Sequence, residues 1–224
     1  MDNADQYSTK SDFAYAVIRN RILAHEYVPG ATINQATLAK EIGISTTPLR
    51  EALRRLKQEG LVELDAHRDA YVTKLSVEEA RDLLELRLAL DPLAAALAAE
   101  RRTREDIAEI RRSSEVNALS NQPTVVDLVA HRRFHRAIYV ASHNDVLIAT
   151  LDGLWDKADR YRLVGLREGR DQPERDKKNE EHQQLVLAVI AGNPDEAAAV
   201  MRAHISDSLG ARAAWFMERN STSV

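Results

Sequence analysis

The sequence predicts a mainly α-helical protein: an N-terminal winged helix-turn-helix followed by an antiparallel, all-helical bundle of about six helices. Ala, Leu, Glu and Arg are abundant, whereas the 224 residues include only 8 Gly and 6 Pro, a composition that favours helix. Apolar residues recur at helical spacing along most of the chain, and two short strand-like runs lie close together near residue 65. We expect two domains, 1–75 and 76–224.

Capping and turn residues mark the elements of the first domain. Asn34 is expected to cap the second helix, and either Ser45 or Thr46 is expected to cap the third. Gly43 and Gly60 stand where a helix ends on a left-handed residue. The expected helices cover residues 13–25, 35–41 and 46–59, and the expected strands cover residues 61–64 and 71–73.

The second domain is expected to begin with a helix after Ser76. Ser76 and Glu79 form the S-x-x-E pattern of a capping box, in which two side chains each bond the other's backbone N–H. Breaks in the helical periodicity then divide the remaining chain. The expected helices cover residues 77–100, 103–119, 124–142, 145–168, 174–192 and 195–218.

Composition excludes several classes of protein. The chain has no cysteine, which excludes disulfides and thiolate metal sites, and no apolar run approaches the ~20 residues of a membrane span. Residues 1–10 lack the basic and apolar regions of a signal peptide, so we expect a cytoplasmic protein without membrane contact. Residues 1–75 carry ten basic and ten acidic side chains, so contact with nucleic acid would depend on local clustering.

Such a cluster lies on the third expected helix. Hydroxyl side chains begin the helix, where they and the helix N-terminus suit a phosphate group. Arg50 is the best candidate for a base or phosphate contact, while Arg54 and Arg55 would meet the DNA backbone or remain ordinary surface arginines. The alternative is a solvated helix without a nucleic-acid role. The predicted DNA-binding residues are Ser45, Thr46, Thr47, Arg50, Arg54 and Arg68.

Four of the seven histidines lie on apolar faces of expected helices: His131, His135, His182 and His204. An imidazole in an apolar interior needs a hydrogen-bond partner or a metal ion. Any one of them alone could be a hydrogen-bonded core histidine. Together they predict a site for a divalent transition metal, with Zn or Ni favoured. His131 could also lie outside the coordination shell, which would leave three histidines and open positions.

An anionic effector is expected beside this site. Four neutral ligands leave the charge of a dication uncompensated, which favours a further ligand such as the carboxylate of a small organic acid. Arg87 interrupts an apolar stripe and would either pair with an internal carboxylate or clamp the effector. Arg160 and Arg162 are weaker candidates for this role, with surface salt bridges as the alternative. Asn144 is expected either to bind the effector or to cap a helix.

Several runs resemble one known family. VPGATINQATLAKEIGISTTPLREALRRLKQEGLVE, part of a match over residues 13–74, resembles the N-terminal domain of GntR-family transcriptional regulators. ELRLALDPLAAALAA (85–99), HRRFHRAIYVASHN (131–144) and EHQQLVLAVIAGNPDEAAAVMRAHI (181–205) resemble the FCD domain of the FadR-like subfamily. The resemblance implies a ligand-responsive transcription factor, not an enzyme, that binds a double-stranded DNA operator as a homodimer through its FCD interface.

The resemblance also implies a metal bound by one aspartate and three histidines. The three histidines correspond to His135, His182 and His204, and His131 stands at the aspartate position. Thr46 replaces a common arginine and Asp69 replaces the usual glycine of the wing, so the operator is expected to differ from the family's typical sequence. Two alternatives are a regulator whose metal is purely structural and a helical enzyme whose histidine-bound metal activates water.

Overall fold

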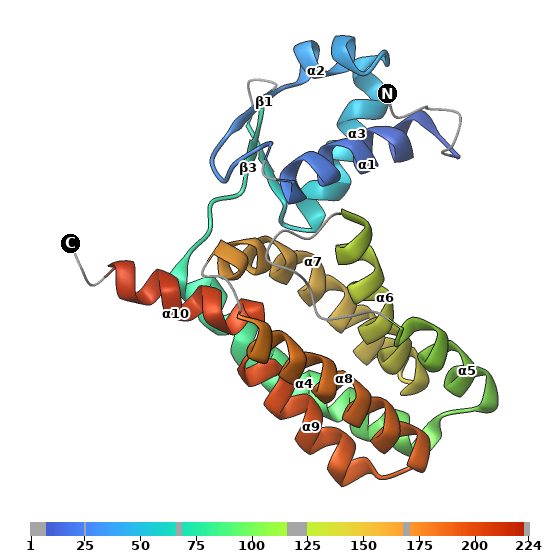
Figure 1. The fold of residues 1–224 in the computed structure, drawn as a ribbon. Helices are drawn as coiled ribbons and strands as arrows, with labels where there is room; N and C mark the ends of the chain where they lie inside the picture. Colours follow the sequence, from blue (N-terminus) through green and yellow to red (C-terminus); the bar gives the residue numbers. More distant parts are fainter. Residues whose placement is uncertain (1–7, 25, 66–68, 116–124, 168–170, 222–224) are drawn as a thin grey trace. The chain divides into compact units, whose positions relative to one another are not determined.

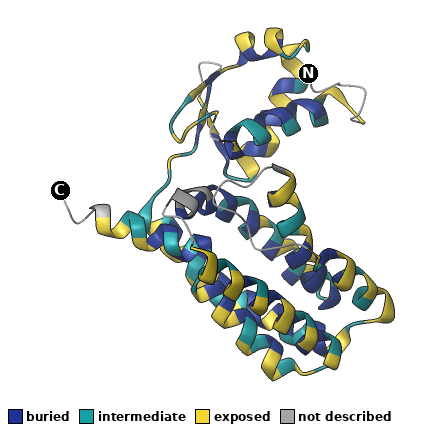
Figure 2. Cartoon of the chain, viewed as in Figure 1, coloured by how far each residue is buried: buried dark blue, intermediate teal, exposed yellow. Residues whose placement is uncertain are grey.

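The computed structural model describes residues 8–24, 26–65, 69–115, 125–167 and 171–221. The chain divides into two compact units, Met1–Leu75 and Ser76–Val224, each built around its own apolar core (Figures 1 and 2). The mainly helical fold class is confirmed, and the sheet belongs to the first unit.

The first unit combines three helices with a small antiparallel sheet whose strand order is β1-β3-β2. The sequence did not predict the first strand. This strand has only three residues, of which Ile33 alone is buried, so no alternation of apolar and polar residues can be recognised. The strand is defined by its pairing with β3, where Ile33 lies opposite Ala70. The first helix begins three residues earlier than expected, because the Thr9 side chain caps it by accepting from the Asp12 N–H. The elements are α1 (Lys10–Leu23), β1 (Thr32–Asn34), α2 (Gln35–Glu41), α3 (Thr46–Gln58), β2 (Val62–Leu64) and β3 (Asp69–Val72).

The predicted ends of the helices in this unit are largely confirmed. The side-chain oxygen of Asn34 accepts from the Thr37 N–H at 2.9 Å and so caps α2. Gly43 and Gly60 both have the left-handed backbone that ends a helix, with φ of 72° and 71°. Ser45 occupies the cap position of α3, but its side chain makes no capping hydrogen bond with the described residues.

One face of α3 anchors the helix in the core of the first unit. Leu49, Ala52, Leu53 and Leu56 are fully buried at helical spacing and belong to the same apolar cluster as Ile18 of α1. Because four residues of one stripe face inward, the opposite face of α3 is directed to solvent. The packing of α3 therefore sets which of its side chains are available to a partner.

The second unit is a bundle of helices around α4, which packs against each of the helices from α6 to α10. A run of alanines on α4 (Ala94, Ala95, Ala98 and Ala99) is fully buried and allows close approach of its neighbours. The described residues form α4 (Val77–Arg101), α5 (Arg104–Ser113), α6 (Val125–Ala141), α7 (Asp145–Arg167), α8 (Gln172–Ala191), α9 (Pro194–Ser206) and α10 (Leu209–Ser221).

The bundle departs from the prediction at one break. The single helix expected over 195–218 is interrupted at residues 207–208, which gives α9 and α10 instead. The start of α10 lies so close to α7 that a Cβ built on Gly165 would stand 2.1 Å from the Leu209 carbonyl oxygen. Only glycine fits at this crossing. Among the helices of the described residues, none combines the length and apolar character needed to cross a membrane.

The expected capping box at the start of α4 forms only in part. The Ser76 hydroxyl accepts from the Glu79 N–H at 2.9 Å, as predicted. The second bond of the box, from the Ser76 N–H to the Glu79 side chain, is replaced: the Ser76 N–H donates to the Tyr161 hydroxyl at 3.2 Å. The Glu79 carboxylate instead accepts from Tyr161 and Arg160. The first residue of the second unit is thereby attached to α7.

Candidate functional site

The N-terminal end of α3 presents polar and basic side chains to solvent. The predicted residues Ser45, Thr46, Thr47, Arg50 and Arg54 are all exposed on or just before this helix, opposite its buried stripe. The Nε of Arg50 donates to the Gln35 side chain at 3.3 Å, which holds the arginine beside the start of α2. Arg68 lies outside the described residues.

Arg55 differs from these side chains because it is held within the first unit. Its guanidinium lies 4.2 Å from the Tyr15 ring centroid and donates to Asp12 at 2.7 Å. Hydrogen bonds from Ser8, Thr9 and Arg55 lower the pKa of Asp12 to about 2, so its carboxylate is ionised at neutral pH. These partners favour a role for Arg55 within the first unit over the expected contact with the DNA backbone.

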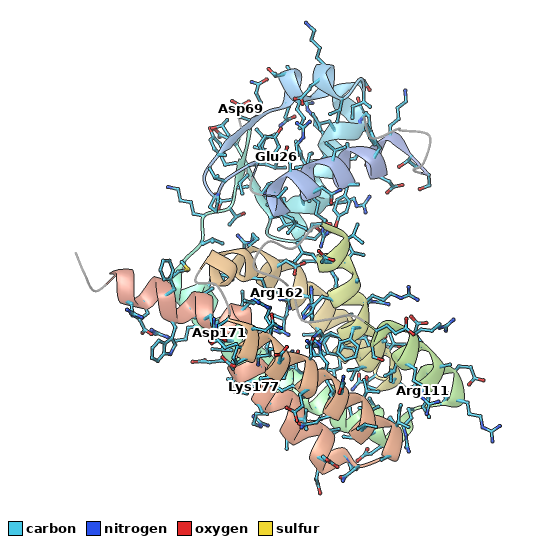
Figure 3. All side chains as sticks on the ribbon, viewed as in Figure 1. Glu26, Asp69, Arg111, Arg162, Asp171 and Lys177 are labelled. Atoms are coloured by element: carbon cyan, nitrogen blue, oxygen red, sulfur yellow. The ribbon has the colours of Figure 1, made fainter. Side chains whose placement is uncertain are left out.

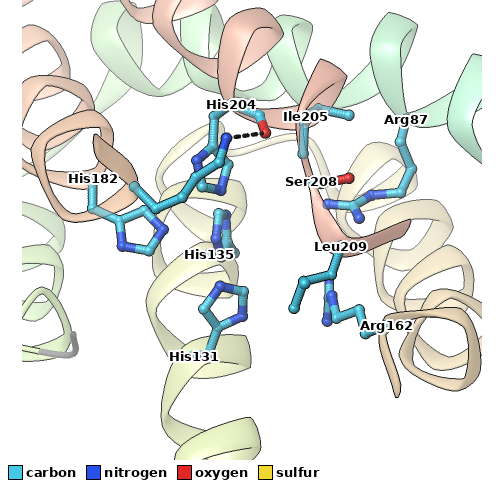
Figure 4. A pocket seen from close by; sticks show the side chains of 10 residues that line it. Arg87, His131, His135, Arg162, His182, His204, Ile205, Ser208 and Leu209 are labelled. Atoms are coloured by element: carbon cyan, nitrogen blue, oxygen red, sulfur yellow. Dashed lines mark hydrogen bonds between the residues drawn. The ribbon is translucent and has the colours of Figure 1, made fainter. Parts of the chain in front are cut away.

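The second unit brings the four predicted histidines together from three helices. α6 supplies His131 and His135, α8 supplies His182 and α9 supplies His204 (Figure 4). One ring nitrogen from each lies within 4.8 Å of the others. Metal–nitrogen bonds of about 2.0–2.1 Å place two nitrogen ligands no more than about 4 Å apart. The four ring nitrogens would therefore need to move only slightly closer together to coordinate one ion.

The hydrogen bonding of these rings fits a metal ion. Among the described residues, neither ring nitrogen of His135 has a hydrogen-bond partner, nor does Nδ1 of His131, although all three atoms are buried. A buried polar atom without a partner costs free energy, and such atoms are rare in folded proteins. A shared ion would bind one nitrogen of each ring, whereas a conventional apolar core would leave all three atoms without partners.

His204 is oriented by a carboxylate that the sequence reasoning missed. Glu181 lies 2.9 Å from Nδ1 of His204, which leaves Nε2 of that ring for the cluster. Lys178 donates to Glu181 at 2.7 Å and to the His204 carbonyl oxygen at 3.2 Å. The i,i+3 spacing of Lys178 and Glu181, next to His182, was the available signal.

Burial keeps these imidazoles in the form that binds metal. Desolvation lowers the pKa of His131, His135 and His204 below the usual 6.5, so the rings are neutral at physiological pH. Burial alone would raise the pKa of Glu181, but hydrogen bonds from His204 and Lys178 outweigh it and lower that pKa to about 2. An ionised carboxylate therefore faces a neutral ring.

Arginines and Lys178 line the same cavity as the histidines (Figure 4). Arg87 donates to Asp91 at 2.8 Å, and the Tyr139 hydroxyl donates to the same carboxylate at 2.6 Å. Arg87 thus pairs with an internal carboxylate, as one of the two alternatives predicted, and it also lines the cavity. Arg162 lies inside the unit (Figure 3). It donates to Asp159 at 2.6 Å, with its guanidinium carbon 3.7 Å from the Trp155 ring centroid.

Two residues predicted to bind the effector do not line this cavity. Arg160 is absent from the cavity lining and donates to Glu79 at 3.1 Å, because it points away from Arg162 on α7. The Asn144 side chain accepts from the Leu147 N–H at 3.1 Å, so it caps α7 instead of reaching the cavity. The weaker candidate Arg162 is the one that lines the cavity.

Comparison with known proteins gives matches over both units. Residues 10–72 match the model of bacterial regulatory proteins of the gntR family, and residues 82–207 match the FCD domain. The Nta operon transcriptional regulator of Aminobacter aminovorans is 29% identical over 82% of this chain and 85% of its own. The putative L-lactate dehydrogenase operon regulatory protein of Escherichia coli is 31% identical over 75% of this chain and 72% of its own.

A further relative is the HTH-type transcriptional repressor GlaR of Escherichia coli, 27% identical over 85% of this chain and 90% of its own. Among solved structures, E. coli McbR/YncC has a TM-score of 0.72 at 22% identity and covers 96% of this chain and 97% of its own. That structure supports the fold. The families and curated relatives regulate transcription and are not enzymes.

Proposed function

Because the chain belongs to the gntR family of bacterial regulatory proteins and carries an FCD domain, we propose that it senses a small organic acid through a metal ion and adjusts operator binding in response. Regulators of this family bind DNA operators and typically act as dimers. One observation carries the proposal: four clustered histidines and two buried arginines line a single cavity.

The metal would be held by His131, His135, His182 and His204. Neutral imidazoles suit Zn or Ni, and the carboxylate of Glu181 orients one of them. When bound, the ion supplies a positive charge and coordination positions for an anionic oxygen. A coordination shell of three histidines without His131 remains the alternative, with one more position for the effector.

The effector's carboxylate would meet the guanidiniums of Arg87 and Arg162. Each of these side chains is buried and directs its charge toward the cavity. The cavity has a volume of about 20 Å³, which is room for about one water molecule. An acid can therefore enter only if the surrounding helices move apart, and this movement is the source of a signal.

Two of those helices are attached to the start of the second unit. α4 carries Arg87 and begins after Ser76, the first residue of that unit. α7 carries Arg162, and the neighbouring Tyr161 accepts from the Ser76 N–H. Movement of α4 or α7 would therefore move Ser76, the residue at which the second unit is joined to the first. A coupling of ~1–3 kcal/mol would change operator affinity several-fold or more.

Operator binding would use the exposed N-terminal end of α3. A recognition helix presents short polar and basic side chains there, and Thr46, Thr47 and Arg50 do so. A homodimer joined through its FCD units would place two such helices on paired half-sites. The first unit has no net charge, so affinity would depend on the local cluster that includes Arg54.

The first test is to immunoprecipitate the tagged protein from its native host and map the bound DNA. Sharp peaks over a short palindrome are expected, and the neighbouring genes nominate the acid. The palindrome is then used to measure affinity for the metal-loaded and the chelator-treated protein, with and without that acid. An acid response that persists without metal would overturn the sensing mechanism. Chelation that unfolds the protein, with no acid raising its Tm, would favour a purely structural metal.

A further inference from the structure

The cavity is lined by cations, and each has a carboxylate of its own. Arg87 pairs with Asp91 at 2.8 Å, Arg162 with Asp159 at 2.6 Å and Lys178 with Glu181 at 2.7 Å. Each pair joins positions three or four residues apart on one helix. The three pairs add no net charge to the cavity.

The pairs are nevertheless oriented. Arg87, Arg162 and Lys178 are among the residues that line the cavity, and Asp91, Asp159 and Glu181 are not. Asp91 is fully buried and Asp159 nearly so. The positive end of each pair thus faces the cavity and the negative end lies behind it, which makes the wall attractive to anions.

The two arginines differ in how well their carboxylates compensate them. Although burial opposes it, the charge of Asp91, assisted by Tyr139, raises the pKa of Arg87 above its ordinary value. Burial lowers the pKa of Arg162 to about 10, and Asp159 offsets this only in part. Of the two arginines, Arg162 is therefore the one for which a further anion would bring the greater stabilisation.

We propose that the effector of this cavity is a short dicarboxylic acid bound as its dianion, with Arg162 as the residue that selects for the second carboxylate. The inference rests on the proposed function and deepens it. Four neutral histidines leave the two positive charges of a divalent ion uncompensated, and the ion-paired wall adds none. A dianion balances this charge, whereas a monoanion leaves one buried positive charge, which is costly.

The geometry limits the ligand to a short molecule. One indole, Trp155, lies close both to histidines and to arginines of the cavity wall. Its ring centroid is 5.0 Å from that of His135 and 5.8 Å from that of His131. The guanidinium carbons of Arg162 and Arg87 lie 3.7 Å and 5.0 Å from the same ring. Because both groups lie close to the same ring, the histidines and Arg162 are near one another, and a ligand that joins them is short.

The test compares acids of equal carbon number on the zinc-loaded full chain at neutral pH. Propionate is paired with malonate and butyrate with succinate, and binding is measured by calorimetry and by the shift in Tm. At least one diacid is expected to bind more than about tenfold more tightly than its partner. Monoacids that match both diacids would overturn the dianion inference and leave acid sensing intact. If no acid of either kind binds, both proposals are wrong.

A paired substitution tests the role of Arg162 without leaving a buried charge alone. Asp159→Asn combined with Arg162→Gln should keep zinc binding and abolish the preference for the diacid. The control is Arg132→Gln combined with Asp156→Asn, which removes an ion pair between α6 and α7 that does not line the cavity. Circular dichroism checks the fold of each.

The conservative variant Arg162→Lys keeps the positive charge and should retain a preference for the diacid. An undiminished preference in the Asp159→Asn, Arg162→Gln protein would remove Arg162 from the proposal. A loss of equal size in the Arg132 control would do the same, because it would point to a general effect of altered α7 packing.

Discussion

The exposed face of α3 and the cavity of the second unit use arginine in opposite ways. Arg50 and Arg54 reach into solvent from a helix whose other face is fully buried. Arg87 and Arg162 are buried, and each is bound to a carboxylate on its own helix. The first arrangement leaves positive charge available to a large polyanion. In the second arrangement each arginine forms an ion pair without net charge, and the positive end of that pair is directed to the cavity.

This difference has consequences for stability and for specificity. An exposed arginine contributes little to folding, so its loss should weaken DNA binding and leave the first unit folded. A buried arginine cannot be removed alone without leaving its carboxylate unpaired, so its loss affects folding as well as binding. Variants that separate binding from folding therefore test whether the two regions act as proposed.

The largest effect is expected from His135→Ala in the second unit. Both ring nitrogens of His135 are buried and have no hydrogen-bond partner among the described residues, so the variant removes a metal ligand and no hydrogen bond. Metal affinity should fall more than about 100-fold, beyond the effect of altering a residue that only orients a ligand. Competition with a chromophoric chelator measures this loss.

The control for this variant is His143→Ala, which removes an exposed histidine bonded to Asp106 outside the cluster. Its metal affinity should match the unmodified chain. Unchanged metal affinity in His135→Ala would show that the buried nitrogens serve another purpose. The same experiment on His204→Ala should give a comparable loss together with loss of the acid response.

The next effect is expected from Arg50→Ala in the first unit. Loss of a base or phosphate contact should cost ~1–3 kcal/mol, or about 5- to 150-fold in operator affinity, measured by fluorescence anisotropy. The melting curve should stay close to that of the unmodified chain. Arg55→Ala is the matched control, because Arg55 is bound to Tyr15 and Asp12 and should affect stability more than affinity. Wild-type affinity in Arg50→Ala would refute the recognition-helix assignment.

Much of the fold could be predicted because it depends on local patterns. The cap by Asn34 and the left-handed Gly43 need only a few neighbouring residues, and both are confirmed. β1 escaped prediction because its three residues are defined by pairing with β3, almost forty positions later. The second bond of the capping box at Ser76 could not be predicted for a similar reason, since Tyr161 replaces the expected partner from 85 residues away.

The cavity was predictable in composition and not in detail. Helical periodicity placed each histidine on an apolar face, and packing of three helices then brought the four rings together. The choice between Arg160 and Arg162 could not be made in this way. Side chains two positions apart on a helix point about 200° apart. The rotation of α7 about its own axis in the bundle therefore decides which of the two arginines meets the cavity.

A smaller loss of metal affinity is expected from Glu181→Gln. This variant keeps the size of the side chain and removes the charge that orients His204 and pairs with Lys178. Metal affinity should fall about 10- to 100-fold, as is usual for a residue that supports a ligand. Glu180→Gln, at an exposed neighbouring position, serves as the control. Equal affinity in the two variants would mean that Glu181 only stabilises the helix pair.

The smallest effect, and the one that connects the two regions, is expected from Tyr161→Phe. Its hydroxyl bonds the Ser76 N–H and Glu79, so the variant removes two of the hydrogen bonds that attach α7 to the start of α4. The bond from Arg160 to Glu79 and the cavity lining stay unchanged. Metal, acid and operator should each bind as before when measured separately. The acid-induced change in operator affinity should shrink by 0.5–2 kcal/mol, or about 2- to 30-fold.

Tyr15→Phe controls for the loss of a phenol–carboxylate hydrogen bond, because Tyr15 donates to Glu59 at 3.0 Å within the first unit. Its acid response should be unchanged. A full response in Tyr161→Phe would exclude these two hydrogen bonds as the route. The remaining connections would be the Arg160–Glu79 pair and α4 itself, which carries Arg87 and begins after Ser76. A loss of acid binding itself would instead place Tyr161 among the residues that shape the cavity, so separate measurement of binding and response decides between the two roles.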